Sequence, residues 1–373
     1  MNVLVTGAKG FIGKNLCLAL VNAQYTVFEY DLTSTDEDLK KYLAEADWIV
    51  HLAGINRPIT PEEFIDGNVN FTKKLLDLIV ESGSEAPIIF SSSTQAVLDN
   101  PYGQSKKAAE EEILAFSQKQ DHPVYIFRFY NAFGKWCRPN YNSVIATFCY
   151  NISHGLPIAI NEQAPAIDFV YIDDIVASLL STIKSDGKGS KDIIYPEPHY
   201  SVRVNQIAEA LKGFKASRTN FMVPEISDPF FKKLYSTYLS YLDERDFAYP
   251  LLSHKDQRGS FTEILKTVGQ GQISVNISRP GITKGNHYHM SKNEKYLVVS
   301  GLCEIKFRKV GAENVITYKC GGDDLKVVDI PPGYTHSITN VGKDDSITLM
   351  WANECYDPNI PDTFFLPVEE TKQ

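Results

Sequence analysis

The sequence lacks the features that mark membrane-bound, secreted or nucleic-acid-binding proteins. No apolar run approaches the ~20 residues that a membrane-spanning helix needs. No charged segment with a cleavage site precedes the first strand-like run, residues 2–6, so nothing indicates secretion. The net charge of −9 gives no positive excess for non-specific binding to nucleic acid. We therefore expect a cytoplasmic protein that binds neither nucleic acid nor membranes.

Cysteine is also scarce. The six cysteines show no Cys-x-x-Cys spacing and stand mostly among apolar residues. This pattern is typical of buried thiols in a reducing compartment, which agrees with a cytoplasmic location.

The chain does contain enough hydrophobic residues for two domains, with 43% hydrophobic content over 373 residues. Its N-terminal part alternates strand-like and helix-like segments. After Tyr249-Pro250 the strand-like segments become short and frequent, and Gly and Asp interrupt them. The pattern predicts a doubly wound α/β domain of the Rossmann type over residues 1–245 and an all-β domain over residues 246–373.

A glycine-rich turn follows the first predicted strand. Gly7, Gly10 and Gly13 separate residues 2–6 from a helical pattern over residues 14–22. Such a turn lets the backbone approach a pyrophosphate, whose charge then lies at the helix N-terminus. Because Asp31 ends the second predicted strand, the turn has the setting of a dinucleotide site.

The sequence leaves the choice of nicotinamide cofactor open. The Asp31 carboxylate can accept a hydrogen bond from a ribose 2′-hydroxyl and repels a 2′-phosphate, which favours NADH. The Lys9 ammonium can instead attract that phosphate, which favours NADPH.

A second constellation has the residue types needed for proton transfer. Tyr102 and Lys106 are four apart, so on a helix their side chains share one face. A nearby ammonium is expected to lower the pKa of the phenol, which can then exchange a proton with a carbonyl oxygen. Ser93, at the end of a predicted strand, can donate a hydrogen bond to the same oxygen.

Residues 1–240 resemble the extended short-chain dehydrogenase/reductase family, in the branch that acts on nucleotide sugars. The matching positions are Gly7, Gly10, Gly13, Asp31, His51–Gly54, Asn68, Ser93, Tyr102, Lys106, Arg128–Gly134 and Asp168–Asp174. The resemblance implies catalysis by Ser93, Tyr102 and Lys106. It also implies a cofactor site made of Gly7, Lys9, Gly10, Phe11, Ile12, Gly13, Asp31, Leu52, Ala53, Gly54, Asn68 and Lys106.

Two departures from this family bear on the substrate. Ile167 stands where the family often has an arginine, so Arg138 and Arg203 are the candidates for the diphosphate, while Asn131 is expected to face the sugar. Thr94 and Gln95 replace the acid pair of the sugar dehydratases, which disfavours dehydration and leaves reduction or epimerisation. Asp173 is expected to cap the helix that follows it.

The C-terminal part contains a candidate metal site. His287 and His289 are two apart, so on a strand both imidazoles point to one face. Glu294 follows at the start of the next predicted strand, and His336 begins another after Pro331-Pro-Gly333. Three imidazoles and one carboxylate can bind a divalent first-row metal and leave a position open for water or substrate.

The spacing of these ligands resembles the two cupin motifs. The first motif runs from Gly281 to Gly301 and the second from Pro331 to Asn340, although Leu325 replaces the glycine expected ahead of the second. The opening of the domain, residues 256–261, is similar to that of the sugar-nucleotide 3,5-epimerase branch of cupins. The resemblance implies a small antiparallel barrel with the metal in its mouth.

The whole chain resembles a family of bifunctional capsule and O-antigen enzymes of UDP-N-acetyl-L-fucosamine pathways, notably over residues 100–106, 133–150, 234–242 and 281–289. This implies that the cupin epimerises C3 of UDP-2-acetamido-2,6-dideoxy-β-L-arabino-hexos-4-ulose. The reductase would then convert the C4 ketone to the L-talo product with NADPH, NADH being the alternative. It further implies Zn²⁺, or another divalent metal, and a homodimer formed through the cupin domain.

Several points stay open at the sequence level. The base that removes the C3 proton could be Tyr296, Tyr334, Lys295 or a water on the metal. The main alternative function is a simple 4-keto-sugar reductase, or a 4-epimerase, whose cupin is only a metal-stabilised dimerisation module. A sensor of nucleotide sugars without catalysis is a third interpretation, which the Tyr102/Lys106 pair disfavours.

Overall fold

The structure is a computed structural model that describes residues 1–161, 163–185, 187–190 and 192–369. It divides into two compact units. The first contains residues 1–212 and 226–243, and the second contains residues 213–225 together with the chain from Glu244 onward. Among the described residues, no helix has the length and apolar character needed to cross a membrane.

The first unit is built on a five-stranded parallel sheet in the order β2-β1-β3-β4-β5. Its strands are β1 (Asn2–Thr6), β2 (Thr26–Tyr30), β3 (Trp48–His51), β4 (Ile88–Ser93) and β5 (Val124–Phe129). A smaller sheet, in the order β6-β7-β8, contains β6 (Asn131–Phe133), β7 (Ile167–Tyr171) and β8 (His199–Val202).

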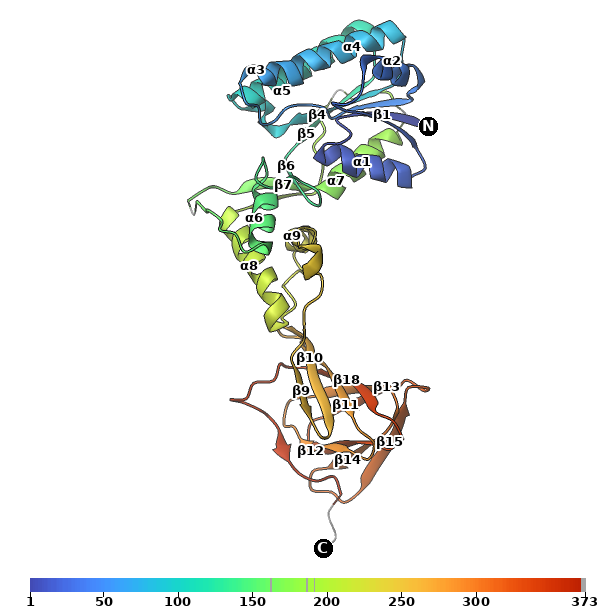
Figure 1. The fold of residues 1–373 in the computed structure, drawn as a ribbon, viewed down its shortest axis with the longest axis vertical. Coiled ribbons are helices and arrows are strands. Elements are labelled where there is room, and N and C mark those ends of the chain that lie inside the picture. Colours follow the sequence, from blue (N-terminus) through green and yellow to red (C-terminus); the bar gives the residue numbers. More distant parts are fainter. Residues whose placement is uncertain (162, 186, 191, 370–373) are drawn as a thin grey trace. The chain divides into compact units, whose positions relative to one another are not determined.

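Helices cover both faces of the large sheet (Figure 1). α1 (Phe11–Asn22) and α7 (Ile172–Ile183) pack on one face, in a cluster that includes Val3 and Val5. α2 (Asp36–Glu45), α4 (Phe71–Ser82) and α5 (Pro101–Gln120) pack on the other face, in a cluster that includes Leu4. Because successive strand residues point to opposite faces, one apolar run supplies both cores, as expected for a doubly wound domain.

The remaining helical segments lie outside the two layers that cover the large sheet. The helical elements outside the two main layers are α3 (Glu62–Phe64), the π-helix Ile65–Asn70, the 3₁₀ turn Thr94–Val97, α6 (Val144–Ser153), α8 (Val204–Asn220) and α9 (Pro229–Leu239). The second half of α8 belongs to the second unit, which also contains the 3₁₀ turn Glu244–Asp246.

The second unit consists of two antiparallel sheets. The six-stranded sheet, in the order β16-β13-β18-β11-β10-β9, contains β9 (Ser253–Asp256), β10 (Gly259–Thr267), β11 (Gly271–Ser278), β13 (Glu294–Ser300), β16 (Val327–Ile330) and β18 (Ser346–Ala352). The five-stranded sheet, in the order β15-β14-β17-β12-β19, contains β12 (Thr283–Tyr288), β14 (Leu302–Lys309), β15 (Val315–Gly321), β17 (Tyr334–Asn340) and β19 (Phe364–Phe365).

The interior of the second unit is apolar in one part and polar in another. An apolar cluster joins the two sheets, with Tyr296 and Val298 from β13 packed with Ile305 and Phe307 from β14. The buried side chains of β11, in contrast, are all polar: Gln272, Ser274, Asn276 and Ser278. Burying polar side chains without partners is costly, so these four side chains indicate that this part of the interior makes polar contacts as well as apolar packing.

Candidate active sites

The glycine turn of the first unit lies between β1 and α1. Gly7 has φ +70°, and a Cβ there would lie 2.8 Å from the backbone nitrogen of Ala53. Gly10 is the N-cap of α1, and no side chain caps the first amide groups of the helix. The helix begins at Phe11 and Ile12, earlier than the Lys14 start that periodicity predicts.

Gly13 allows the helix to pack directly on this turn. A Cβ at Gly13 would lie 2.2 Å from Gly7 O, which is far inside van der Waals contact. We expect Gly13→Ala to lower the free energy of unfolding by about 1–3 kcal/mol and to weaken NAD(P)H binding, because α1 must move away from the turn. Chemical denaturation and cofactor titration would check this. Gly213→Ala is the matched control, because a Cβ at Gly213 meets nothing within 4 Å, and equal effects of both variants would contradict the argument.

Asp31 and Lys9 lie together just after β2. The Asp31 carboxylate accepts hydrogen bonds from the backbone N–H of Lys9 at 2.7 Å and of Leu32 at 2.8 Å. The Lys9 ammonium donates to Thr33 Oγ1 at 3.0 Å. The two residues to which the sequence assigns opposite effects on a 2′-phosphate are thus neighbours, through the Lys9 backbone and through Thr33.

This arrangement predicts how one substitution changes cofactor preference. Asp31→Asn removes the negative charge and keeps an acceptor oxygen for the Lys9 amide. We expect the ratio of kcat/KM for NADPH over NADH to rise about tenfold, which corresponds to about 1.4 kcal/mol of lost repulsion. Steady-state kinetics with both cofactors would measure it. The control is Asp77→Asn on the exposed face of α4, and an unchanged ratio in Asp31→Asn would contradict the prediction.

Ser93, Tyr102 and Lys106 are brought together by β4 and α5, as the sequence predicts. Ser93 ends β4 and is buried, and Lys106 is buried one turn beyond Tyr102 on α5. The Lys106 Nζ lies 4.8 Å from the centre of the Phe90 ring. A Cβ on Gly54 would lie 3.6 Å from the same nitrogen, so the lysine reaches the loop after β3.

The pKa values of this group differ from the sequence expectation. Burial raises the pKa of Tyr102, with the hydrogen bond to Ser93 lowering it in part, so the expected lowering by Lys106 is wrong for this structure. Burial also lowers the pKa of Lys106 from 10.5 to about 8, although Glu110 opposes this. A phenol that keeps its proton at neutral pH suits a proton donor.

Asn68 positions the loop that adjoins Lys106. The sequence predicts a helical segment over residues 64–82, and the structure places Asn68 of this segment in the π-helix Ile65–Asn70. Its Oδ1 accepts from Ile55 N at 2.8 Å, and its Nδ2 donates to Ile55 O and to Ser105 Oγ at 2.9 Å each. Ser105 was not among the predicted site residues, although it lies within the Tyr102–Lys106 motif. The loop after β3, Leu52 to Gly54, lies between Gly7 on one side and Asn68 on the other.

His51 ends β3 and is a core residue. Its Nδ1 lies 2.7 Å from Thr6 Oγ1 and its Nε2 lies 2.9 Å from Thr72 Oγ1. Burial, with a smaller effect of Lys106, lowers the pKa of His51 to about 3, so the imidazole is neutral.

The Lys106 pKa predicts a pH effect on stability. The unfolded lysine keeps its proton up to about pH 10.5, whereas the folded one loses it near pH 8, so stability rises with pH between these values. At neutral pH we expect the free energy of unfolding of Lys106→Met to be roughly 3 kcal/mol higher than that of the wild type, which is the equivalent of this pKa difference. Denaturant titrations at several pH values would test it against Lys107→Met, an exposed neighbour. A Lys106→Met protein less stable than wild type at pH 7 would contradict it.

The three residues predicted for the substrate are all exposed. Asn131 starts β6, and its Nδ2 donates to Asp168 O at 3.1 Å. The Arg138 guanidinium lies 5.1 Å from the centre of the Tyr141 ring. Arg203 directly precedes α8, where its backbone N–H donates to Gln206 Oε1 at 3.1 Å.

The predicted cap of α7 is wrong. Tyr171 is the N-cap, and Asp173 and Asp174 lie in the first turn of the helix. Their carboxylates pair with Lys135 at 2.5 Å and Lys233 at 2.6 Å. Sequence spacing could not show these partners, because both lysines are far away along the chain.

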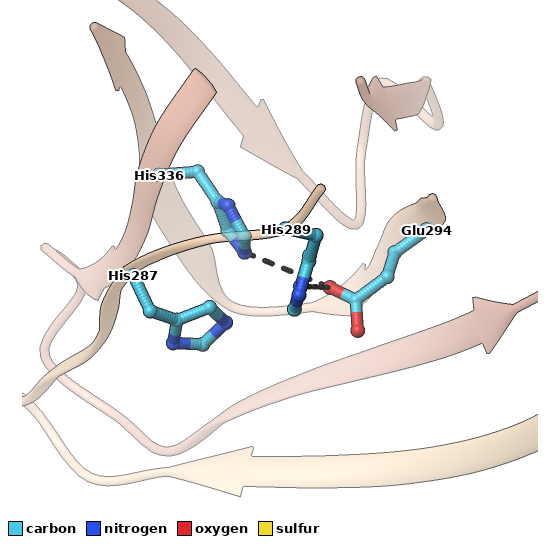
Figure 2. Close-up of side chains that lie close together, drawn as sticks. All are labelled: His287, His289, Glu294 and His336. Carbon is cyan, nitrogen blue, oxygen red and sulfur yellow. Dashed lines mark ion pairs between the residues drawn. The ribbon is translucent and has the colours of Figure 1, made fainter. Parts of the chain in front are cut away.

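The second unit brings His287, His289, Glu294 and His336 together, as the sequence predicts. One ligand atom from each lies within 4.8 Å of the others. Figure 2 shows the three imidazoles turned toward the Glu294 carboxylate. Its Oε2 lies 3.7 Å from His289 Nε2 and 3.6 Å from His336 Nε2.

The hydrogen bonds of this cluster suit a cation. His289 Nδ1 donates to the main-chain oxygen of Asp362 at 2.6 Å, so the other ring nitrogen, Nε2, faces the cluster. Within the described residues, the buried Nε2 atoms of His289 and His336 have no hydrogen-bond partner. Burial and the two other imidazoles lower the pKa of His287 to about 4. A divalent metal held by these nitrogens and the Glu294 carboxylate would give the two Nε2 atoms the partner that they lack.

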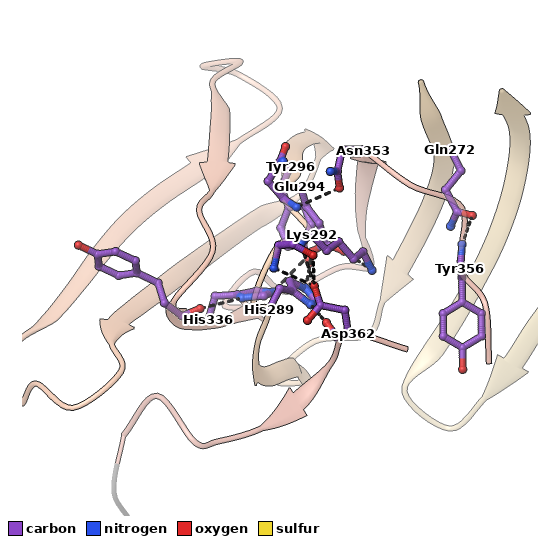
Figure 3. Close-up of polar contacts among 12 residues, drawn as sticks. Gln272, His289, Lys292, Glu294, Tyr296, His336, Asn353, Tyr356 and Asp362 are labelled. Carbon is purple, nitrogen blue, oxygen red and sulfur yellow. Dashed lines mark hydrogen bonds and ion pairs between the residues drawn. The ribbon is translucent and has the colours of Figure 1, made fainter. Parts of the chain in front are cut away.

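Glu294 is ionised although it is largely buried. Burial opposes ionisation, but the imidazoles of His289 and His336 and the Lys292 ammonium together hold the pKa of Glu294 well below its ordinary value. Lys292 Nζ lies 3.1 Å from Oε1, and the Tyr296 hydroxyl donates to Oε2 at 2.8 Å (Figure 3). The carboxylate is thus fixed from both sides.

A β-bulge sets the register of the ligands. The pairing of β12 with β17 shifts between Gly285 and His287, and this shift puts His287 directly opposite His336. Asn286, the extra residue, has φ +59°, and Gly285 has φ +99°. A Cβ at Gly285 would lie 2.7 Å from His336 O. The glycines of the predicted motif are Gly281 and Gly301, whereas the glycine that lets these two strands meet is Gly285.

A cavity of about 360 Å³ opens beside this cluster. Glu294 and Lys292 contribute to its wall, together with Gln272 and Ser274 from the polar face of β11. The rest of the lining is His254, Phe261, Glu263, Lys266, Met350, Trp351, Ala352 and Tyr356. The lining combines polar side chains, aromatic rings and the Glu294 carboxylate, and this combination suits a polar organic ligand.

Two family descriptions match the chain. Residues 3–195 match the NAD dependent epimerase/dehydratase family, and residues 254–364 match the polysaccharide biosynthesis C-terminal domain. The chain therefore belongs to the NAD dependent epimerase/dehydratase family. The Rossmann-type domain and the all-β region that the sequence predicts are both confirmed.

Within that family the chain is CapF-like, which confirms the full-length resemblance. It is 43% identical to the UDP-2-acetamido-2,6-beta-L-arabino-hexul-4-ose reductase of Pseudomonas aeruginosa, over 99% of this chain and 100% of the relative. The crystal structure of capsular polysaccharide assembling protein CapF from Staphylococcus aureus matches with a TM-score of 0.93 and 48% identity, over 99% of this chain and 100% of that one. MoeE5 in complex with UDP-glucuronic acid and NAD matches with a TM-score of 0.51 and 26% identity, over 59% and 83%.

Proposed function

We propose that this chain acts twice on one nucleotide sugar: it epimerises C3 of UDP-2-acetamido-2,6-dideoxy-β-L-arabino-hexos-4-ulose and then reduces the C4 ketone to UDP-2-acetamido-2,6-dideoxy-L-talose. The product would serve the synthesis of UDP-N-acetyl-L-fucosamine for capsule or O-antigen. The observation that carries the proposal is full-length similarity to a reductase named for such a 4-ketose.

The reduction is assigned to Ser93, Tyr102 and Lys106. NADPH, or NADH, bound at the glycine turn supplies the hydride for C4. Tyr102 donates its phenol proton to the C4 oxygen, and its raised pKa keeps that proton available at neutral pH. The Lys106 ammonium stabilises the phenolate that remains, and the Ser93 hydroxyl orients the C4 oxygen of the sugar. Hydride plus proton converts the ketone to an alcohol.

The epimerisation is assigned to the second unit, which we interpret as a cupin barrel. Zn²⁺, or another divalent metal, held by His287, His289, Glu294 and His336 would supply positive charge beside the ketone. The cavity wall holds the sugar next to this cluster, and the Lys292 ammonium adds a second positive charge for the oxyanion formed when C3 loses its proton. Return of a proton to the opposite face inverts C3.

Three candidates for the C3 base lose support. Lys295 pairs with Asp329 on an exposed surface. The Tyr296 hydroxyl is committed to Glu294, and burial raises its pKa well above the ordinary value. Among the described residues, neither these two nor Tyr334 lines the cavity.

The arrangement of the whole protein is also part of the proposal. Residues 1–245 would form the reductase and residues 246–373 the epimerase, and a homodimer would form through the second of these. Arg138 and Arg203 would bind the diphosphate, Asn131 would face the sugar, and the enzyme would work in the cytoplasm.

One experiment tests both halves together. The 4-keto UDP-sugar is incubated with NADPH in heavy water, and the product is analysed by mass and proton spectra. We expect deuterium at C3 and a net gain of one hydride at C4. A reduced product without deuterium at C3 would indicate a plain reductase. A C4-epimerised sugar formed without net oxidation of NADPH would indicate a 4-epimerase. No turnover at all would indicate a sensor.

A further inference from the structure

The C-terminal segment of the second unit reaches the proposed metal site from a distant part of the chain. Its residue Asp362 accepts the Nδ1 hydrogen of His289 with its main-chain oxygen at 2.6 Å. The other nitrogen of that ring faces the cluster. The bond therefore fixes both the tautomer and the orientation of one ligand.

The Asp362 side chain holds the turn that joins β12 to β13. Oδ1 accepts from Met290 N at 2.9 Å, and Oδ2 accepts from Ser291 N at 2.9 Å, Ser291 Oγ at 3.0 Å and Lys292 N at 2.8 Å. This turn follows His289 and ends two residues before Glu294. One carboxylate thus binds three consecutive amide groups that connect two of the candidate ligands. Figure 3 shows Asp362 beside Lys292 and His289.

The segment that carries Asp362 is itself anchored. β19 pairs with β12, with Phe365 opposite His287. Leu366 N donates to Asn286 O at 2.9 Å, and the Arg308 guanidinium donates to the main-chain oxygens of Val368 and Pro367 at 2.8 and 2.7 Å. Asp362 is therefore held independently of the turn that it binds.

We propose that Asp362 is a positioning residue of the metal site. Its carbonyl orients His289, and its carboxylate fixes residues 290–292 so that Lys292 and Glu294 meet at the cavity. The inference rests on the proposed metal site and adds to it a residue that no ligand motif contains.

Asp362→Asn tests this directly. An amide side chain has one acceptor oxygen, so one side of the turn then faces an NH₂ donor instead. We expect Zn²⁺ to bind about 10–100-fold more weakly, measured by competition with a chromogenic chelator. The visible spectrum of the Co²⁺-loaded variant should also change, because the geometry of His289 changes.

The matched control is Asp357→Asn on the same segment, because its carboxylate accepts from Asn359 within its own turn. Its Zn²⁺ affinity should stay within about twofold of wild type. Unchanged affinity in Asp362→Asn, or equal losses in both variants, would overturn the inference while leaving the metal site intact. A wild-type protein that binds neither Zn²⁺ nor Co²⁺ would overturn the metal site and this inference together.

A milder variant covers the case in which Asp362→Asn does not fold. Ser291→Ala removes one of the four side-chain hydrogen bonds of Asp362. Its Zn²⁺ affinity is expected to fall about fivefold, the effect of one ordinary hydrogen bond. Wild-type affinity together with an unaltered Co²⁺ spectrum in Ser291→Ala would count against the inference.

Discussion

Glu294→Gln and His287→Ala will stop the exchange of the C3 hydrogen with solvent and leave the reduction of an already epimerised substrate unchanged. Each variant removes one of the four converging ligands. We expect Zn²⁺ affinity to fall more than about 100-fold, beyond the cost of losing an outer hydrogen-bond partner. The reductase residues belong to the other compact unit and keep their contacts. Deuterium at C3 and NADPH oxidation are measured on the same samples.

The control for the carboxylate variant is Glu304→Gln, on β14 of the same unit, where the carboxylate lies 3.5 Å from Lys319 Nζ. It should exchange and reduce at wild-type rates. If folded Glu294→Gln protein still incorporates deuterium at the normal rate, the epimerase assignment fails. The second unit would then be a metal-stabilised dimerisation module, and the ligand variants would shift the oligomeric state instead.

Tyr102→Phe will lower kcat for reduction by about 10²–10⁴, the usual contribution of a positioned general acid. The variant removes the proton donor and leaves the ring in place beside Phe64, whose centre lies 5.8 Å away. The glycine turn is untouched, so NADPH affinity should not change. C3 exchange, in the other unit, should continue at the wild-type rate. Loss of nicotinamide absorbance and the C3 label report the two activities separately.

Tyr125→Phe is the matched control, because it removes the hydroxyl of another buried tyrosine of the same unit. That hydroxyl lies 3.2 Å from Ser185 Oγ. It should reduce at the wild-type rate. A kcat for Tyr102→Phe within threefold of wild type would remove Tyr102 from the mechanism and leave the proton to another donor.

Local sequence patterns predict most of the first unit. The runs over residues 2–6 and 26–30 become β1 and β2 with the predicted bounds. Continuous β-branched and apolar residues suit the buried strand β1, whereas β2 is an edge strand in which Thr26 and Glu29 are exposed. Helix bounds are less well predicted. The pattern over residues 205–214 predicts one helix, but α8 extends to Asn220, and its second half belongs to the second unit.

The ligand types and their spacing are also readable from the sequence. His-x-His on one strand and a glutamate at the next strand start predict the candidate metal cluster, because strand periodicity puts both imidazoles on one side. The same reasoning places Tyr102 and Lys106 on one face of α5. Spacing alone fails for their pKa values, because burial depends on what the fold places around them.

By itself, the sequence determined the kinds of elements, the glycine turn after the first strand and the four residues of the candidate metal cluster, since these follow from periodicity and residue chemistry within short windows. Only the tertiary structure decided the bulge at Asn286 that faces His287 with His336, the protonated state of Tyr102 and the contact of Asp362 with a turn about seventy residues earlier. The physical reason is that strand register and burial depend on contacts between residues far apart in the chain, and local patterns do not specify those contacts.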